Sequence, residues 1–242
     1  RAPVLMGRPG DAALPTGLAS RPHHSPLPNQ GDPETMSTHD HTPAALARML
    51  AAQKQAFNGA GAVDGATRRR RIQAAIDLLV KHYKPLVTAM DEDFGGRHPG
   101  FSLMNDVLGS LASLKHARDH FEPWMAAEKR QPFVPYDQFG AEAWVQYQPK
   151  GSVGIIGTWN APMFTLFAPL AYALAAGNRT ILKPSEIVPR TAAVIADAVA
   201  ELFDPLEVAV VTGGPEMGAA LSAQPFDHLV FTGSTEVGKA IM

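Results

Sequence analysis

The feature that most constrains the fold is the regular alternation of short apolar runs and helical segments from residue 151 to residue 242. Short runs rich in Val, Ile and Leu that alternate with helices predict a parallel, doubly wound sheet of the α/β class. The expected strands are 153–158, 180–183, 208–212 and 228–232, and the expected helices are 163–176, 191–202, 216–222 and one beginning at Ser234.

The N-terminal 42 residues lack this order. Residues 1–35 hold seven of the 21 prolines and show no apolar periodicity, so residues 1–42 are predicted to form a disordered extension. Met36 is a candidate translation start. His23-His24 and His39-x-His41 resemble metal ligands, but a polar tail without a scaffold is the preferred interpretation, and no metal site is predicted.

Residues 43–131 are predicted to be a helical region that packs on the sheet domain. One helix is expected over 45–57 and another after the Gly-rich turn 58–65, with Thr67 as its N-cap. A third is expected over 102–130, with a break near Pro123. The apolar side of the second helix is predicted to contain Ile72, Ile76, Leu79, Val80, Tyr83 and Val87.

Four consecutive arginines, Arg68 to Arg71, begin the second of these helices. Positive charge gains nothing from the positive end of a helix dipole. We interpret the run as a solvated face or an interface in preference to a nucleic-acid patch.

Residues 132–150 change to a period of two. Ala143, Val145 and Tyr147 alternate with Trp144, Gln146 and Gln148, which predicts a strand. We expect this segment to pair with another subunit, in a homodimer or a homotetramer.

Charge and hydropathy exclude several classes of partner. Twenty-one Lys and Arg stand against 23 Asp and Glu, so the chain has no basic excess for nucleic acid or for an anionic membrane surface. The longest nearly apolar run, 163–176, is shorter than the roughly 20 residues of a membrane span. A cytoplasmic protein is therefore predicted.

Three polar loop tips follow the expected strands. Trp159-Asn160 comes after the first strand, the run 183–186 after the second, and Gly233-Ser234 after the fourth. Ligands of doubly wound sheets bind beyond the carboxyl ends of the strands. The joint placement of these tips predicts one binding site.

These residues resemble the aldehyde dehydrogenase superfamily, over essentially all of residues 45–242. The resemblance lies in the runs 154–162, 175–178, 182–186 and 231–238. Asp93-Phe94-Gly95, Gly157-Thr158-Trp159-Asn160 and Phe226-Asp227-His228 look most like the class 3, fatty-aldehyde and coniferyl-aldehyde branch. The resemblance implies an aldehyde-dehydrogenase-like fold with a Rossmann-type sheet flanked by helices, in which residues 151–242 form a partial NAD(P)-binding domain.

The resemblance also implies NAD as cofactor, with NADP as the alternative. Glu186 is suited to accept from both ribose hydroxyls beside the donor Lys183, and the amides after Gly233 open a helix whose dipole favours phosphate. Glu186 should disfavour the 2′-phosphate of NADP. The expected cofactor-binding residues are Ile156, Thr158, Trp159, Lys183, Ser185, Glu186, Gly214, Phe231, Gly233, Ser234 and Val237.

In the family, a cysteine thiolate attacks the aldehyde, and a side-chain amide at the position of Asn160 helps to hold the oxyanion. Hydride transfer then leaves a thioester, which a glutamate-activated water hydrolyses. The chain contains no cysteine. We therefore expect an N-terminal half that is truncated before the catalytic domain and is inactive by itself, from an enzyme that oxidises a coniferyl, aromatic or fatty aldehyde.

Two hypotheses from other classes stay open at this point. Gly233 to Lys239 fits the phosphate-loop pattern G-x-x-x-x-G-K of an NTPase, although Ala240 stands where that loop needs Ser or Thr. A non-catalytic nucleotide-binding or oligomerisation module is the second. Asp93-Phe94-Gly95 mimics a kinase metal motif, but a helix end closed by Gly95-Gly96 is the preferred interpretation.

Overall fold

The computed structural model describes residues 42–242. The predicted extension, apart from Thr42, therefore lies outside the described residues, as do the candidate start at Met36 and the four histidines before residue 42.

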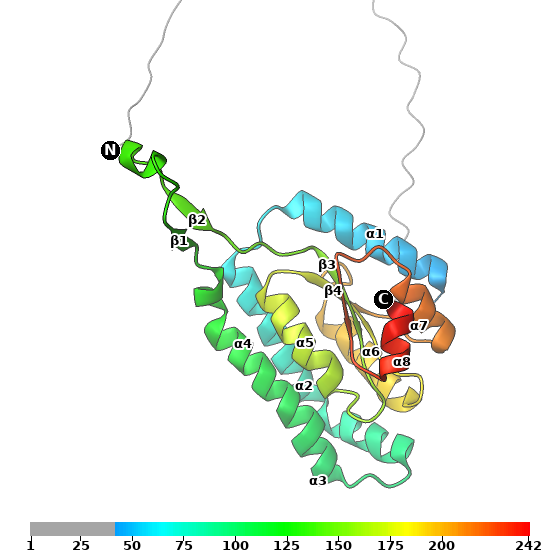
Figure 1. The fold of residues 1–242 in the computed structure, drawn as a ribbon. Coiled ribbons are helices and arrows are strands. Elements are labelled where there is room, and N and C mark those ends of the chain that lie inside the picture. The colour runs from blue at the N-terminus through cyan, green and yellow to red at the C-terminus, as the bar shows by residue number, and fades with distance from the viewer. Residues whose placement is uncertain (1–41) are drawn as a thin grey trace, which may run out of the picture. The chain divides into compact units, whose positions relative to one another are not determined.

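The centre of the fold is a four-stranded parallel sheet with the order β5-β4-β3-β6 (Figure 1). Its strands are β3 Ser152–Ile156, β4 Arg179–Lys183, β5 Val208–Val210 and β6 His228–Phe231. The intervening helices are α5 Phe164–Ala175, α6 Pro189–Leu202 and α7 Pro215–Ser222, and α8 Thr235–Ile241 follows β6. The α/β fold with a parallel sheet is confirmed. Each of these strands and helices begins and ends within two residues of its predicted bounds.

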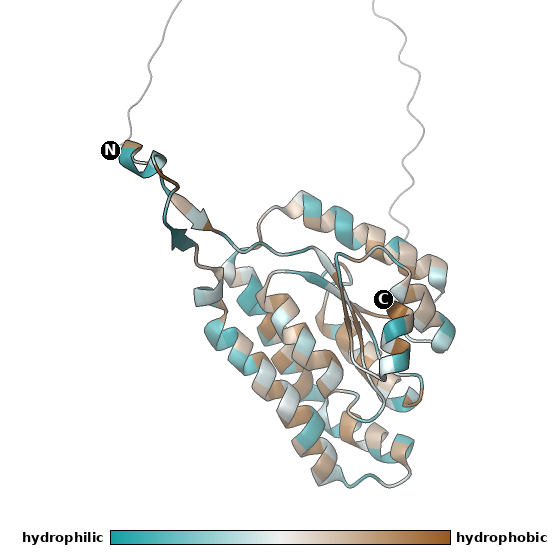
Figure 2. Cartoon of the chain, viewed as in Figure 1, coloured by the Kyte–Doolittle hydropathy of each residue, from teal (hydrophilic) through white to brown (hydrophobic). Residues whose placement is uncertain are grey.

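Each strand contributes to two apolar cores, because successive side chains point to opposite faces. Ile155 and Leu182 lie in the core that α2 Gly65–Phe94, α4 Gly109–Met125, α5 and α6 cover. Their neighbours Ile156 and Ile181 lie in a second core, covered by α1 Pro43–Ala60 and α7. Figure 2 shows the strands of this sheet as predominantly hydrophobic and α4 as alternating between hydrophobic and hydrophilic turns.

Helix α2 begins earlier than predicted and buries a different side. Its N-cap is Asp64, whose side chain accepts from the amide of Thr67, so Thr67 is a donor inside the helix and not the cap. Val80 and Tyr83 are exposed, contrary to the predicted stripe. Because α2 packs against α4, α5 and α6, the buried side also takes in residues that the simple stripe omitted: Ala75, Leu78, Leu86 and Met90.

The interpretation of the arginine run as solvated is wrong for two of its four members. Arg68 is buried and donates to the backbone oxygens of Val63 and Ala175, both at 3.0 Å. Arg71 is buried against Glu207, which Arg70 also contacts. The Ala175 carbonyl at the end of α5 and the Glu207 carboxylate before β5 are long-range partners, which the local helix-dipole argument did not include.

The third helix is divided. It consists of α3 Pro99–Ser102, a π-helical segment at Leu103–Leu108, and α4, which passes Pro123 and ends at Met125. The predicted helical end is instead strand β1 Glu128–Arg130, which pairs antiparallel with β2 Ala143–Val145. All three residues of β1 are exposed, and they form a strand because residues 143–145 pair with them.

The β1–β2 hairpin projects from the helices (Figure 1). It carries exposed apolar side chains. A short 3₁₀ helix, Tyr136–Phe139, lies in its connection. Exposed members of this surface are Phe133, Val134, Tyr136, Phe139, Trp144 and Tyr147. No helix within residues 42–242 has the length and apolar character that crossing a bilayer requires.

Candidate functional site

The strand order reverses between β3 and β6, and the principal cavity lies beyond their carboxyl ends. It has a volume of about 840 Å³ and is lined by residues from three βα connections, those after β3, β4 and β6, and from the helices α5, α7 and α8. Such a reversal point is where open α/β sheets leave a crevice between loops that run in opposite directions. The cavity is in the size range of small-molecule sites.

The structure brings the three predicted loop tips together at this cavity. Of the twelve residues named from the sequence as catalytic or cofactor-binding, eleven line it: Ile156, Thr158, Trp159, Asn160, Lys183, Ser185, Glu186, Phe231, Gly233, Ser234 and Val237.

Gly214 is the residue that the structure places elsewhere. It is the N-cap of α7, its amide donates to Glu216 Oε1 at 2.9 Å, and the lining begins at the next residue, Pro215. Its amide is thus already partnered by the side chain that follows it.

Lys183 and Glu186 form the charged part of the cavity. Lys183 Nζ donates to Glu186 Oε2 at 2.8 Å and to the Pro184 oxygen at 3.1 Å, which leaves one of its three N–H groups for a ligand. Only 3% of the Lys183 side chain is exposed, against 37% of that of Glu186. Burial has the largest single effect on the Glu186 carboxyl and raises its pKa, but the hydrogen bond and charge of Lys183 and a hydrogen bond from the Glu186 backbone together outweigh it and lower the pKa. The carboxylate is therefore ionised at neutral pH.

The Asn160 loop connects β3 to α5 and turns tightly over the start of that helix. A Cβ atom at Gly157 would lie 2.7 Å from Leu166 Cγ, so the loop needs glycine there. The amide of Thr158 donates to Thr165 Oγ1 at 2.9 Å, and the same hydroxyl donates to the Ala161 oxygen at 2.9 Å. The backbone oxygen of Asn160 accepts a hydrogen bond from Arg97 Nη1 at 3.0 Å. The Asn160 residue is exposed and lines the cavity, so its side-chain amide is available to a ligand.

The Gly233-Ser234 tip leads directly into α8. Ser234 is the N-cap, and its side chain accepts from the amide of Val237. A Cβ atom at Gly233 would lie 2.2 Å from the ring of Phe231, so this close approach also requires glycine. Because the residues between Gly233 and Gly238 are mostly helical, they do not form the open anion-binding loop of a P-loop NTPase.

Sequence reasoning missed the wall that α7 and α8 build. Pro215, Gly218, Ala219 and Ser222 line the cavity from α7, and Ala240 and Ile241 line it from α8. The small residues at i, i+1 and i+4 of α7 were the available signal, because they leave room beside a helix. The stem of Lys183 runs beside α7 at Gly218, where a Cβ atom would lie 3.7 Å from Lys183 Cε, an ordinary van der Waals contact.

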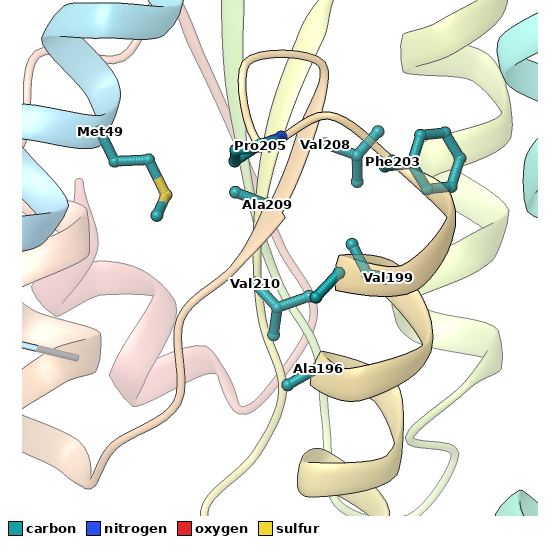
Figure 3. Close-up of a pocket in the computed structure, with 9 residues that line it drawn as sticks. Met49, Ala196, Val199, Phe203, Pro205, Val208, Ala209 and Val210 are labelled. Atoms are coloured by element: carbon teal, nitrogen blue, oxygen red, sulfur yellow. The ribbon is translucent and has the colours of Figure 1, made fainter. Parts of the chain in front are cut away.

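Figure 3 shows a second cavity, between α6 and β5, of about 30 Å³ and lined by apolar side chains. That volume is about one water molecule's share of the liquid, too small for a nucleotide. Within the described part of the chain, no group of three or more metal-ligating side chains gathers.

The geometry defines a crevice at the carboxyl ends of a parallel α/β sheet, and sequence comparison places the chain among known proteins. The family model "Aldehyde dehydrogenase family" matches residues 24–242. The chain belongs to the aldehyde dehydrogenase family.

Two similar proteins are coniferyl aldehyde dehydrogenases by name. A "Probable coniferyl aldehyde dehydrogenase" of Caulobacter vibrioides is 44% identical over 212 residues, covering 87% of this chain and 43% of that protein. A "Coniferyl aldehyde dehydrogenase" of a Pseudomonas species is 45% identical over 199 residues, covering 82% and 40%. The likeness to this branch is confirmed, and the chain spans about two-fifths of the length of these relatives.

Solved structures agree on the fold. Staphylococcus aureus AldH in a substrate-bound state superposes with a TM-score of 0.75 at 29% identity, over 80% of this chain and 42% of that one. A Mycobacterium tuberculosis aldehyde dehydrogenase complexed with NAD+ superposes with a TM-score of 0.71 at 27% identity, over 83% of this chain and 41% of that one.

Proposed function

We propose that this chain provides the cofactor-binding part of an NAD(P)-dependent aldehyde dehydrogenase. The observation that carries the proposal is the convergence of the Asn160, Lys183–Glu186 and Gly233–Ser234 tips on one cavity. Family membership and the NAD+ complex of a structural neighbour support it. The alternative, a non-catalytic nucleotide-binding or oligomerisation module, would use the same cavity without Asn160.

The cavity residues fit a dinucleotide by their chemistry. The third N–H of Lys183 and the carboxylate of Glu186 suit a ribose diol, as donor and acceptor. The wall of small residues between α7 and α8 suits a flat adenine ring, with Ser185, Phe231 and Val237 nearby. The charge of Glu186 opposes a 2′-phosphate, so we place NAD before NADP.

NAD held by these residues would supply the hydride acceptor for oxidation of the substrate. The contribution of this chain to that chemistry is the Asn160 amide, whose N–H groups suit an oxyanion at the reacting carbon; such a donor is worth about 10²–10³ in rate. Because the chain has no cysteine, the attacking thiolate comes from residues outside it. We infer that residues 1–242 alone bind cofactor but do not turn over aldehyde.

The names of the relatives point to coniferyl aldehyde as the substrate, with other aromatic or fatty aldehydes as alternatives. The exposed apolar hairpin supports assembly into a homodimer or homotetramer through residues 132–150. We also propose the cytoplasm as its location and a small aldehyde as its partner, and 21 Lys and Arg against 23 Asp and Glu give no basic excess that would favour nucleic acid.

Thermal unfolding of the chain tests the cofactor assignment. We expect NAD, at concentrations well above its dissociation constant, to raise the Tm, while ATP with Mg²⁺ does not. Protection by ATP with Mg²⁺ but not by NAD would reverse the proposal in favour of an NTPase.

Coding DNA beyond codon 242 tests the enzyme against the non-catalytic module. A Glu-Leu-Gly-Gly-like run followed by a cysteine would support the enzyme, and a stop codon in an intact locus would favour the module.

A further inference from the structure

The first turn of α5 receives its cap from a distant part of the chain. Met163, at the N-cap position, has no side-chain oxygen, and α5 has no cap of its own. The amides of Met163 and Phe164 instead lie 3.1 and 3.4 Å from Asp106 Oδ1. Asp106 lies in the π-helical segment and is fully buried. Its carboxylate thus partners helix N–H groups and faces the positive end of the dipole.

Arg97 connects this cap to the Asn160 loop. Its Nη2 lies 2.6 Å from the other oxygen of Asp106, and its Nη1 donates to the Asn160 oxygen at 3.0 Å. The Arg97 side chain is 8% exposed. The planar guanidinium holds both acceptors in one rigid geometry, which a lysine ammonium cannot reproduce.

Aromatic rings hold the guanidinium in place and extend the contact to Trp159. Arg97 Cζ lies 4.6 Å from the ring centroid of Phe94 and 4.7 Å from that of Phe101. The ring of Phe94 lies 6.2 Å, centroid to centroid, from that of Trp159. The segment around Arg97 therefore contacts two successive residues of the cavity loop.

We propose that Arg97 and Asp106 are positioning residues for Asn160. Thr165 holds the loop at Thr158 and Ala161, so the Arg97 contact fixes the peptide between those points and with it the Cα from which the Asn160 amide extends. The role in catalysis rests on the proposed function. The control of loop geometry does not, since every contact forms without a ligand.

A matched contact at a different helix provides the control. Asp93 accepts from the amides of Arg190 and Thr191 at 3.2 and 2.8 Å, and its side chain is 1% exposed. It caps α6 as Asp106 caps α5, but it does not contact the Asn160 loop. Asp93→Asn therefore weakens a buried carboxylate cap of the same kind elsewhere.

Hydrogen exchange of the full 242-residue chain, measured without cofactor, tests the proposal. We expect Asp106→Asn and Arg97→Met to speed exchange of the peptide covering 158–164 by about tenfold or more, because each removes a charge-assisted hydrogen bond. Arg97→Lys should recover part of this protection. Asp93→Asn should speed exchange near residues 190–191 and leave 158–164 within about twofold of the unmodified chain.

Two results would overturn the proposal. The first is unchanged exchange at 158–164 in both Arg97→Met and Asp106→Asn. The second is an equal acceleration in β4 and α6, which would make the pair a general support of the fold. If Asp106→Asn does not fold, the comparison of Arg97→Met with Arg97→Lys decides. Failure of the unmodified chain to bind NAD would contradict the proposed function and leave the exchange result standing.

Discussion

At the residue scale, burial separates charged side chains with similar sequence signals. Lys183 stands between an apolar strand and a proline, which predicts a strand end, and its ammonium is almost fully buried beside Glu186. Asp93 stands in a motif that resembles a metal site, and the structure uses it as a helix cap, with Gly95 closing α2 in a left-handed conformation as predicted. The difference lies in which groups arrive from elsewhere in the chain.

Asn160→Ala tests the catalytic assignment in a polypeptide that also supplies the thiolate. We expect kcat to fall by about 10²–10³-fold, because an oxyanion donor is lost, with little change in NAD affinity. Steady-state kinetics and NAD titration measure the two effects. Asn58→Ala removes an exposed amide from α1 and should leave kcat unchanged. An unaltered kcat in Asn160→Ala, where chemistry limits turnover, would remove Asn160 from the mechanism.

Glu186→Gln tests the ribose assignment. Loss of the negative charge should lower the affinity for NAD relative to that for NADP by about tenfold. NAD loses a charged acceptor for its ribose diol, and the 2′-phosphate of NADP is no longer repelled. Dissociation constants for both cofactors measure the ratio. Glu122→Gln, which neutralises an exposed carboxylate paired with Arg69, is the control. A ratio equal to that of the unmodified chain would contradict the assignment.

At the element scale, local patterns and long-range contacts determine different properties. The strands and helices after residue 151 follow from periodicity, because burial on two faces leaves a regular pattern. The side of α2 that becomes buried depends on α4, α5 and α6, and the burial of Arg68 depends on the end of α5. The end of α4 and the start of β1 likewise depend on pairing with β2, Ala143–Val145, which lies about 15 residues further along the chain.

Glu207 makes the attachment of α2 to the sheet sensitive to acid. Burial raises its pKa, but Arg70 and Arg71 outweigh this effect and keep the pKa below the ordinary value. A depressed folded pKa adds stability that is present above the unfolded pKa and is lost as the pH falls through the folded pKa. We expect Glu207→Gln to lower the urea midpoint at pH 7 and to differ less from the unmodified chain as the pH falls below about 4.3. A difference that stays constant with pH would refute this linkage.

At the scale of the whole molecule, the topology creates the site. Reversal of strand order between β3 and β6 opens the cavity, and helices on the two faces of the sheet bury the two cores. The same arrangement leaves the β1–β2 hairpin exposed, with Trp144 58% accessible to solvent. Exposed aromatic side chains on a short hairpin favour contact with another chain.

Trp144→Glu tests the hairpin as an oligomer interface. We expect the unmodified chain to sediment as a dimer or larger species, and the variant to dissociate with a dissociation constant raised by about 30-fold, as for a central aromatic contact. Val80→Glu, on the exposed side of α2, is the matched control and should keep the oligomer. A monomer for the unmodified chain across the accessible concentrations would exclude assembly through the hairpin of this chain.

The sequence by itself determined the α/β class, the element order after residue 151 and the loop tips at the strand ends. These depend on apolar periodicity and turn residues, which act over a few positions. Tertiary structure alone decided that Arg68 and Arg71 are buried, that Asp93 and Asp106 cap distant helices, and that α7 and α8 complete the cavity. A buried charge is stable only where a partner reaches it, and folding brings those partners from far along the chain.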